Sequence, residues 1–205
     1  MKNYLTYKFL LSAIVLLFTV PHLYAQSYIP SAEDSNFIYR SIEELPDNPQ
    51  KVFRLHLPKK KLDAVPQEVF KLVNLRELVL NKNRITELPA DISTLRMLER
   101  LDLSNNKLRR LPDEIGALES LLYLGLNRNL IEELPQSMGR LESLEVLELW
   151  DNELSTVPDE IFTLDKLRIL ELRGILFSDE EIARIKSLVP KGTSLYISPP
   201  CNCGN

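Results

Sequence analysis

The feature that most constrains the fold is an internal repeat of 23 residues that runs through residues 75–166 without gap or insertion. Its four copies begin at Leu75, Leu98, Leu121 and Leu144, and each places an aliphatic residue or Met at positions 1, 4, 6, 11, 14, 18 and 21. Every copy also carries Asn at position 9 and Pro at position 15. A repeat of this length cannot bury its own apolar face, so the pattern predicts a solenoid in which neighbouring repeats share one core.

Each repeated position predicts a local structure. The alternation around positions 4 to 6, as in Leu101, Asp102 and Leu103, is typical of a short strand with leucines on one face. The chain must then turn sharply, and a buried Asn there can bond backbone groups that lack another partner. The predicted structural Asn ladder consists of Asn83, Asn106, Asn129 and Asn152.

The pattern LxxLxLxxNxLxxLPxxIxxLxx resembles the leucine-rich repeat, in the 23-residue LPxxI form found in secreted bacterial proteins and in scaffolds that contact Ras-type GTPases. The same frame extends upstream to Val52 and downstream past Leu167, with Lys60 and Ile175 where Asn is expected. The resemblance implies an α/β solenoid of about six repeats over residues 52–174. Its fold would be a right-handed superhelix with a parallel sheet on the concave face and a helical cap at each end.

The first 25 residues have the features of a secretory signal. Lys2 and Lys8 give a basic start, residues 9–20 are almost entirely apolar, and Ala25 precedes a predicted cut before Gln26. We therefore expect a secreted, periplasmic or cell-surface protein that is not inserted in a membrane after cleavage. An uncleaved membrane anchor is the alternative interpretation.

Both flanks of the repeat array depart from the 23-residue pattern. Residues 26–36 are polar and predicted to be flexible, and residues 37–51 are predicted to form the N-terminal cap, with a helix started by a capping box from Ser41 to Glu44. A second box, from Ser178 to Glu181, predicts a capping helix followed by a strand within residues 175–198.

The tail, residues 199–205, holds the two cysteines of the chain, Cys201 and Cys203. Two ligands are too few for a closed zinc site, and a bond between them would close a strained ring. We interpret them as tail thiols that bridge locally or to another chain, with a redox pair or a soft-metal site as the alternatives.

Charge and composition argue against several functions. Two of the 25 basic residues and none of the 29 acidic ones lie in the first 25 positions, so the rest carries 23 against 29, a formal net charge of −6. That balance argues against nucleic-acid binding through bulk charge. No Gly-rich phosphate loop is present, and His56 is the one His after the signal, so we expect no cofactor and no enzyme activity.

The resemblance implies that the outward strand residues on the concave face bind a protein or peptide. On this face early repeats carry cations such as Arg54 and Lys82, later ones carry acids, and Trp150, the one Trp, lies near Tyr123. Exposed aromatics beside charges are typical of protein-binding hot spots. The candidate binding residues are Arg100, Asp102, Leu122, Tyr123, Val146, Glu148, Trp150, Asp151, Ile169, Glu171 and Arg173.

Other interpretations of the same residues stay open. The aromatics are alternatively scattered surface side chains, or Trp150 folds over the sheet edge. The acids Glu148, Asp151 and Glu171 are alternatively a divalent-ion site, although Arg168 and Arg173 are near enough to neutralise them. Besides the extracytoplasmic binding module, we consider an intracellular GTPase-contacting scaffold and an enzyme that uses the acidic face.

Overall fold

The computed structural model describes residues 36–199. The predicted signal, residues 26–35 of the flexible segment and both cysteines of the tail lie outside the described residues. Across the described part of the chain, no helix has the length and apolarity needed to cross a membrane.

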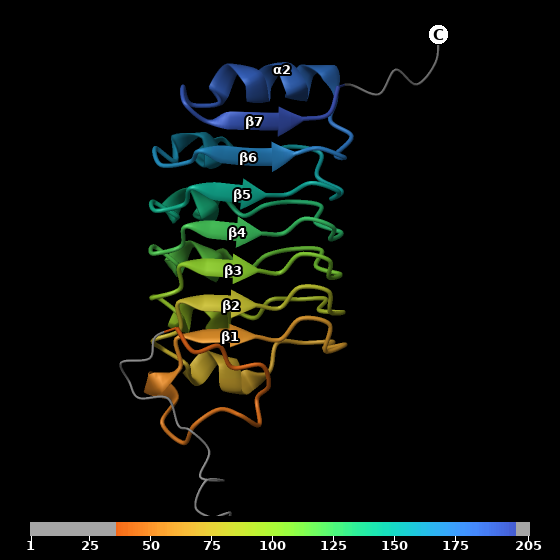
Figure 1. Cartoon of the computed structure of the whole chain (residues 1–205). Coiled ribbons are helices and arrows are strands. Elements are labelled where there is room, and N and C mark those ends of the chain that lie inside the picture. The colour runs from red at the N-terminus through yellow and green to blue at the C-terminus, as the bar shows by residue number, and fades with distance from the viewer. Residues whose placement is uncertain (1–35, 200–205) are drawn as a thin grey trace, which may run out of the picture. The chain divides into compact units, whose positions relative to one another are not determined.

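Seven short parallel strands form one sheet in the order of the chain (Figure 1). Each of β1 to β6 contributes the same repeat positions, so Leu55, Leu78, Leu101, Leu124 and Leu147 pair in a single row. These leucines are fully buried and join one continuous core. The predicted α/β solenoid with stacked repeats is confirmed. The strands are β1 (Arg54–His56), β2 (Glu77–Val79), β3 (Arg100–Asp102), β4 (Tyr123–Gly125), β5 (Val146–Glu148), β6 (Ile169–Leu172) and β7 (Ser194–Ile197).

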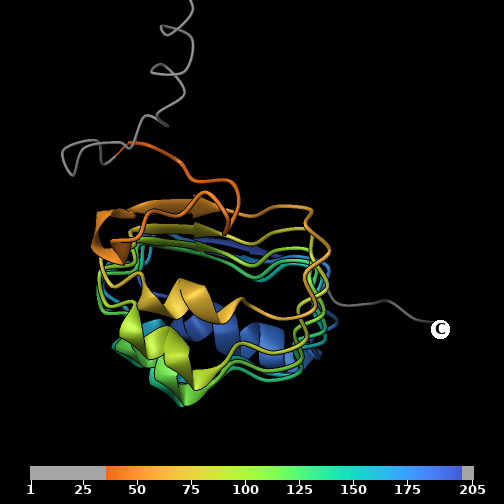
Figure 2. The same ribbon diagram turned by 90° about the horizontal axis from the view of Figure 1, so that it is seen from below.

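The layer opposite the sheet consists of 3₁₀ helices (Figure 2). In each repeat the Pro at position 15 precedes a five-residue 3₁₀ helix, and its fixed φ suits that role because it has no N–H to satisfy. An aliphatic residue of each helix, such as Ile92 or Ile115, packs into the core behind the strands. The helices are η2 (Gln67–Lys71), η3 (Ala90–Thr94), η4 (Asp113–Ala117), η5 (Gln136–Arg140) and η6 (Asp159–Thr163).

The asparagines at position 9 form a buried column at the end of the strands. The Nδ2 of Asn129 donates to the carbonyl oxygens of Leu103 and Leu126, at 3.1 and 2.8 Å, and its Oδ1 accepts from the N–H of Leu108 at 3.0 Å. The three other asparagines make the equivalent bonds. Each side chain therefore ties its own turn to the preceding repeat.

The sharp turn after each strand is made by a left-handed residue at position 8. The φ angles of Lys59, Lys82, Asn105, Arg128 and Asp151 lie between 53° and 57°. In the sixth repeat Gly174 takes this position with a φ of 71°. A left-handed φ is costly for side chains other than Gly, Asn and Asp, so the repeated geometry, and not the residue type, dictates the turn.

Residues 36–51 of the N-terminal flank contain no α-helix, so the helix predicted to begin with a capping box from Ser41 to Glu44 is wrong. The flank instead makes a single turn in which the Leu45 N–H donates to the carbonyl of Ile42, followed by a short 3₁₀ helix, η1 (Pro49–Lys51). Pro46 disfavours helical geometry at the residue before it, and the remaining residues are too few to nucleate a helix.

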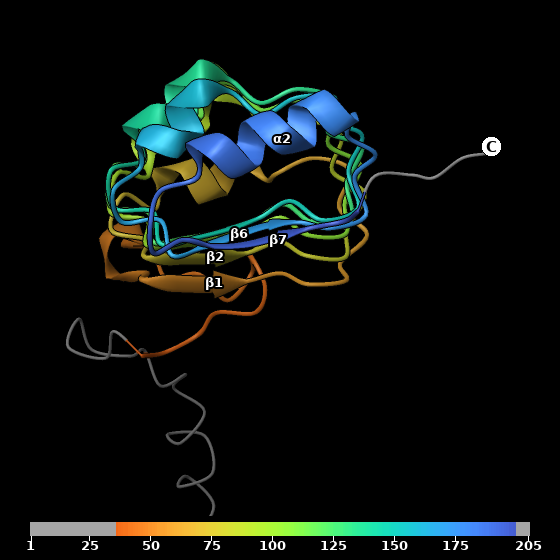
Figure 3. The same ribbon diagram turned by 90° about the horizontal axis from the view of Figure 1, so that it is seen from above.

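At the other end of the array, helix α2 (Asp179–Leu188) continues the layer opposite the sheet, and β7 pairs with β6 (Figure 3). The Ser178 side chain accepts a hydrogen bond from the Glu181 N–H at 3.1 Å, which is half of the expected capping box. The other half is redirected, because the Glu181 carboxylate accepts from the N–H of Val157 in the preceding repeat, at 2.9 Å.

Candidate interaction surface

The strand face turned away from the core, here called the sheet face, carries a line of interacting side chains across five strands. Glu77 pairs with Arg54 on one side and lies 3.7 Å from Arg100 on the other. The Arg100 guanidinium lies 3.7 Å from the centre of the Tyr123 ring, a cation–π contact. The Tyr123 hydroxyl then donates to Glu148 at 2.8 Å. Side chains on neighbouring strands therefore fix one another along this line.

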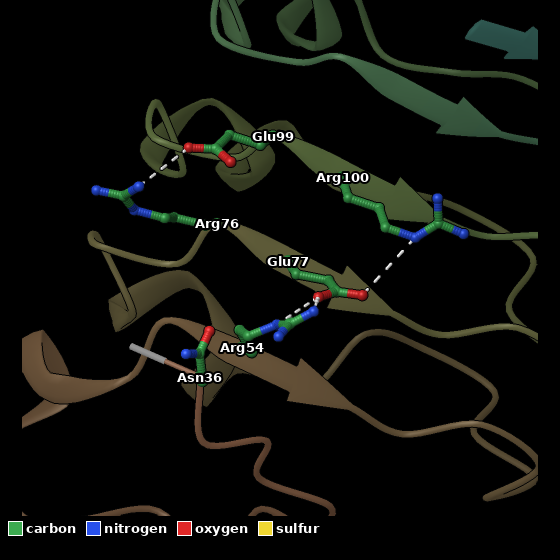
Figure 4. Close-up of a pocket in the computed structure, with 6 residues that line it drawn as sticks. All are labelled: Asn36, Arg54, Arg76, Glu77, Glu99 and Arg100. Atoms are coloured by element: carbon green, nitrogen blue, oxygen red, sulfur yellow. Dashed lines mark hydrogen bonds and ion pairs between the residues drawn. The ribbon is translucent and has the colours of Figure 1, made fainter. Parts of the chain in front are cut away.

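The first strands also form a shallow pocket of about 240 Å³ (Figure 4). Figure 4 shows Glu77 between Arg54 and Arg100, with the Arg76–Glu99 pair beside them. Both guanidinium groups that flank Glu77 already bind its carboxylate. The lining residues are Asn36, Arg54, Arg76, Glu77, Glu99 and Arg100.

Glu77 is the electrostatic centre of this pocket. Burial opposes its ionisation, but the Arg54 hydrogen bond and the charges of His56 and Arg54 outweigh burial, so the pKa of Glu77 is lowered from 4.5. His56 Nε2 lies 3.0 Å from Glu77 Oε1 without the alignment of a hydrogen bond. The positive charges of the pocket are therefore already paired with Glu77 and Glu99, which leaves little free charge to bind another anion.

Gly125, two residues after Tyr123, leaves room for the Tyr123 ring. A Cβ at Gly125 would lie 2.8 Å from the Tyr123 hydroxyl, so a larger residue there would displace the ring from its present position. Burial, together with the hydrogen bond to Glu148 and its charge, raises the pKa of Tyr123 strongly above 10.0. Sequence reasoning missed Gly125, although a glycine inside a strand signals such a close approach.

Two of the acidic candidates, Asp102 and Glu171, face outward but are covered by their neighbours. Each is only 7% exposed. Asp102 accepts hydrogen bonds from Asn81 and Ser104, at 2.8 and 2.7 Å, and Glu171 accepts two from Arg173, at 2.8 and 2.7 Å. Their carboxylates therefore offer few free acceptors to a partner.

Trp150 is half-buried beneath the Arg128 guanidinium, which lies 4.5 Å from the centre of its ring. Arg128 also pairs with Asp151 at 3.5 Å, and both of these side chains are exposed. One face of the Trp150 ring is thus covered by the Arg128 guanidinium. A similar contact lies two strands further along the sheet, where the Arg173 guanidinium is 5.5 Å from the centre of the Tyr196 ring on β7.

The apolar part of the sheet face lies on the later strands. Val146 and Ile169 continue the row of Tyr123 and are half-buried, and Leu122 beside them is 41% exposed. The structure therefore brings Leu122, Tyr123, Val146 and Ile169 together, with Trp150 across the sheet. The outward side chains of the first three strands are mostly charged, whereas those of the later strands include these apolar and aromatic residues.

Within residues 36–199, no group of three or more His, Cys, Asp or Glu side chains is placed to hold a metal ion. The three acids that sequence reasoning considered for a divalent ion each have another partner. Glu148 is bonded by Tyr123, Asp151 by Arg128 and Glu171 by Arg173. Each of the three carboxylates is therefore already engaged by another side chain of the protein.

Comparison with known proteins gives one sequence-family match, which a family model described as a leucine-rich repeat region makes over residues 50–124 and 113–190. Together these ranges span more than half of the chain. A comparison with curated protein sequences gives no significant match.

Several solved structures are similar. A leucine-rich repeat protein of Leptospira interrogans superposes with a TM-score of 0.63 at 28% identity, covering 80% of this chain and 48% of that one. The ectodomain of the Arabidopsis thaliana receptor kinase GASSHO1/SCHENGEN3, in complex with CASPARIAN STRIP INTEGRITY FACTOR 2, gives 0.59 at 27% identity, covering 74% and 21%. The plant peptide hormone receptor RGFR1, in complex with RGF2, gives 0.61 at 26% identity, covering 78% and 26%. This chain thus spans less than half of each.

Proposed function

Because the chain belongs to the leucine-rich repeat family, we propose that it is a non-catalytic module that binds a protein or peptide on its sheet face. Two of the similar structures are receptors in complex with another factor, which supports a role in binding. This chain spans about a quarter or less of those receptors, so their partners are not carried over to it.

The observation that carries the proposal is the fixed geometry of Tyr123. Its ring is packed over Gly125, covered by Arg100 and bonded to Glu148, so little side-chain freedom remains to be lost on binding. Aromatic side chains with an adjacent Arg are typical of binding hot spots. A ring that is already ordered in the free protein loses little conformational entropy when a partner binds.

The chemistry of the patch indicates what such a partner presents. Leu122, Val146 and Ile169 favour an apolar side chain lying beside Tyr123. The guanidinium groups of Arg128 and Arg173 lie over the rings of Trp150 and Tyr196, and both side chains stay more than half exposed although each pairs with one carboxylate. A segment with an apolar anchor and a carboxylate near it fits these side chains best.

We also propose that the protein works outside the cytoplasm. The basic start, the apolar run and Ala25 at the predicted cut support this location. N-terminal sequencing of the protein recovered from its producing cells tests it. A chain that begins at Gln26 supports the proposal, and a chain that keeps residues 1–25 favours the intracellular scaffold or the membrane anchor.

Site-specific photocrosslinking tests the binding face. A photoreactive amino acid placed at Leu122, on the sheet face, should trap a partner from native extract, whereas the same amino acid at Thr163, exposed on η6, should not. Tyr123→Ala should then weaken trapping at Leu122. If both positions trapped a partner equally, or if Tyr123→Ala left trapping at Leu122 unchanged, the binding site would have to lie outside the sheet face.

A further inference from the structure

The turns that follow β1, β2 and β3 carry a second, separate feature, a strip of six exposed cations (the basic strip). They sit at repeat positions 8, 9 and 10, on one side of the stack in Figure 1. Lys60 replaces the buried Asn of the four central repeats and is exposed, so the first turn contributes three consecutive cations. The basic strip consists of Lys59, Lys60, Lys61, Lys82, Arg84 and Lys107.

The six cations of the basic strip lie together and have no carboxylate partner. Within residues 36–199, none of the six lies within 4.0 Å of an Asp or Glu oxygen. Several exposed arginines elsewhere do pair with the next repeat, as Arg109 does with Glu132 at 2.7 Å and Arg110 with Glu133 at 3.2 Å, whereas the exposed Arg96 and Arg140 have no such partner among the described residues but lie singly. The nearest acids in sequence, Asp63 and Glu87, are two to three residues beyond the strip.

The backbone holds the strip in register. The N–H of Lys59 donates to Asn81, and that of Lys82 to Ser104, at 3.1 and 2.9 Å. The N–H groups of Arg84 and Lys107 donate in the same way to the preceding turn, at 2.8 and 2.9 Å. The cations therefore recur at the spacing of adjacent strands, roughly 4.8 Å.

We propose that the basic strip binds a linear acidic polysaccharide that runs along the stack and places uronate or sulfate groups against successive turns. Five of the six cations are lysines, which meet any anion as point charges and do not require the bidentate geometry that Arg favours. Cations that recur on adjacent turns and are not held in ion pairs match a chain with regularly spaced anions.

The composition of the turns argues against other polyanions and against a protein. Residues 58–62, 81–85 and 104–108 contain no aromatic side chain, and their leucines and isoleucine point into or toward the core. Protein interfaces depend on apolar or aromatic anchors, and single-stranded nucleic acids are bound by aromatic stacking. Sequence-specific duplex binding usually places a helix or a two-stranded ribbon in a groove, and none of the six cations lies in a helix or strand.

The experiment measures binding of the purified protein to heparin, to polygalacturonate, to neutral dextran, to anionic vesicles and to duplex DNA by calorimetry, at low and raised salt. Asn favours left-handed φ, so the triple variant Lys59→Asn, Lys61→Asn and Lys82→Asn removes three charges from left-handed positions without strain. The matched control Arg76→Gln, Arg109→Gln and Arg110→Gln removes three charges from ion-paired positions. Thermal unfolding of both variants checks that the fold is kept.

We expect wild-type protein to bind one or both acidic polysaccharides, with an affinity that falls as salt rises, and not to bind dextran. The lysine variant should bind roughly tenfold or more weakly, with a shallower salt dependence, and the arginine control should stay within about twofold of wild type. Binding to one polysaccharide alone supports the proposal and names the anion. Equal losses in both variants, no binding at all, or binding only to anionic vesicles or DNA would overturn it. Photocrosslinking at Leu122 should be unaffected by the lysine variant, which keeps this test separate from that of the sheet face.

Discussion

The hydroxyl of Tyr123 on β4 donates a 2.8 Å hydrogen bond to the carboxylate of Glu148 on β5. This bond joins the charged first half of the sheet face to its apolar second half, because the same ring also lies under Arg100. The proposed binding surface is therefore ordered before any partner arrives.

Tyr123→Phe should lower the free energy of unfolding by about 1 kcal/mol, because it leaves Glu148 with one hydrogen bond fewer. Urea unfolding followed by circular dichroism measures the change. Tyr196→Phe is the control, since that ring is 45% exposed and its hydroxyl donates to no protein group among residues 36–199. A loss of equal size in the control would show that the Glu148 bond is not responsible.

The raised pKa of Tyr123 predicts alkaline sensitivity. The folded protein holds this proton more tightly than the unfolded chain, so its contribution is complete below the ordinary pKa of about 10 and is lost as pH rises above it. Because burial also raises the pKa of Tyr39, ultraviolet titration should show two late-ionising tyrosines among the described residues, and the second of them is Tyr123. In Glu148→Gln it should ionise at lower pH, and an unchanged titration there would contradict the assigned cause.

Glu77→Gln should destabilise the protein by roughly 1–2 kcal/mol at neutral pH, because Arg54 and Arg100 lose their shared carboxylate. The pKa of Glu77 is lowered on folding, so its contribution is present above the ordinary value of 4.5 and disappears as pH falls below it. The difference between variant and wild type should therefore shrink in acid.

The matched control for this change is Glu99→Gln. Glu99 pairs with Arg76 at 3.3 Å, but both side chains are largely exposed, so the expected loss is within about 0.5 kcal/mol. Thermal or urea unfolding at several pH values compares the two variants. A Glu99 variant as unstable as the Glu77 variant would mean that burial does not set the strength of these pairs.

Gly116→Ala should destabilise the protein by about 1–3 kcal/mol, because the new Cβ would lie 2.4 Å from the backbone oxygen of Ser137 in the next 3₁₀ helix. A backbone oxygen cannot be displaced as easily as the end of a side chain, so the two adjacent repeats would have to move apart. Ser93 occupies the same repeat position and already carries a side chain, so Ser93→Ala should change the stability by only a few tenths. Differential scanning calorimetry resolves the two results.

Asn129→Ala should cost roughly 3 kcal/mol, because it removes three buried hydrogen bonds at once and leaves their backbone partners unpaired. Asn105→Gly is the control, since Asn105 lies in the left-handed turn outside the buried column and glycine tolerates that φ. Hydrogen exchange should show the Leu108 amide opening more readily in the Asn129 variant only. Unchanged exchange there would show that the side chain is not what protects this turn.

The repeat array was predictable because the residues that form the strand, the turn and the 3₁₀ helix recur at fixed positions in every 23-residue repeat. Leu101, Asn106 and Pro112 each recur at one position, so strand, turn and 3₁₀ helix could be assigned together. The exposure of Asp102 was not predictable, because it depends on Asn81 in the preceding repeat. Local signals also failed where a neighbour overrides them, as Pro46 does for the Ser41 capping box.

Helix α2 and β7 close the far end of the array, and their removal should expose its core. Ile182 and Ile185 of α2 are buried, and the Glu181 carboxylate bonds the Val157 N–H of the preceding repeat. Ile185→Ala should therefore cost about 2–5 kcal/mol, whereas Lys186→Ala, on the exposed side of the same helix, should cost less than about 0.5. Deletion of residues 182–205 should lower both solubility and the unfolding temperature, since a solenoid needs a polar outer end. If the deleted chain unfolded at the wild-type temperature and stayed soluble, the sixth repeat would have to be its own cap, and Ile185→Ala would then be expected to cost little.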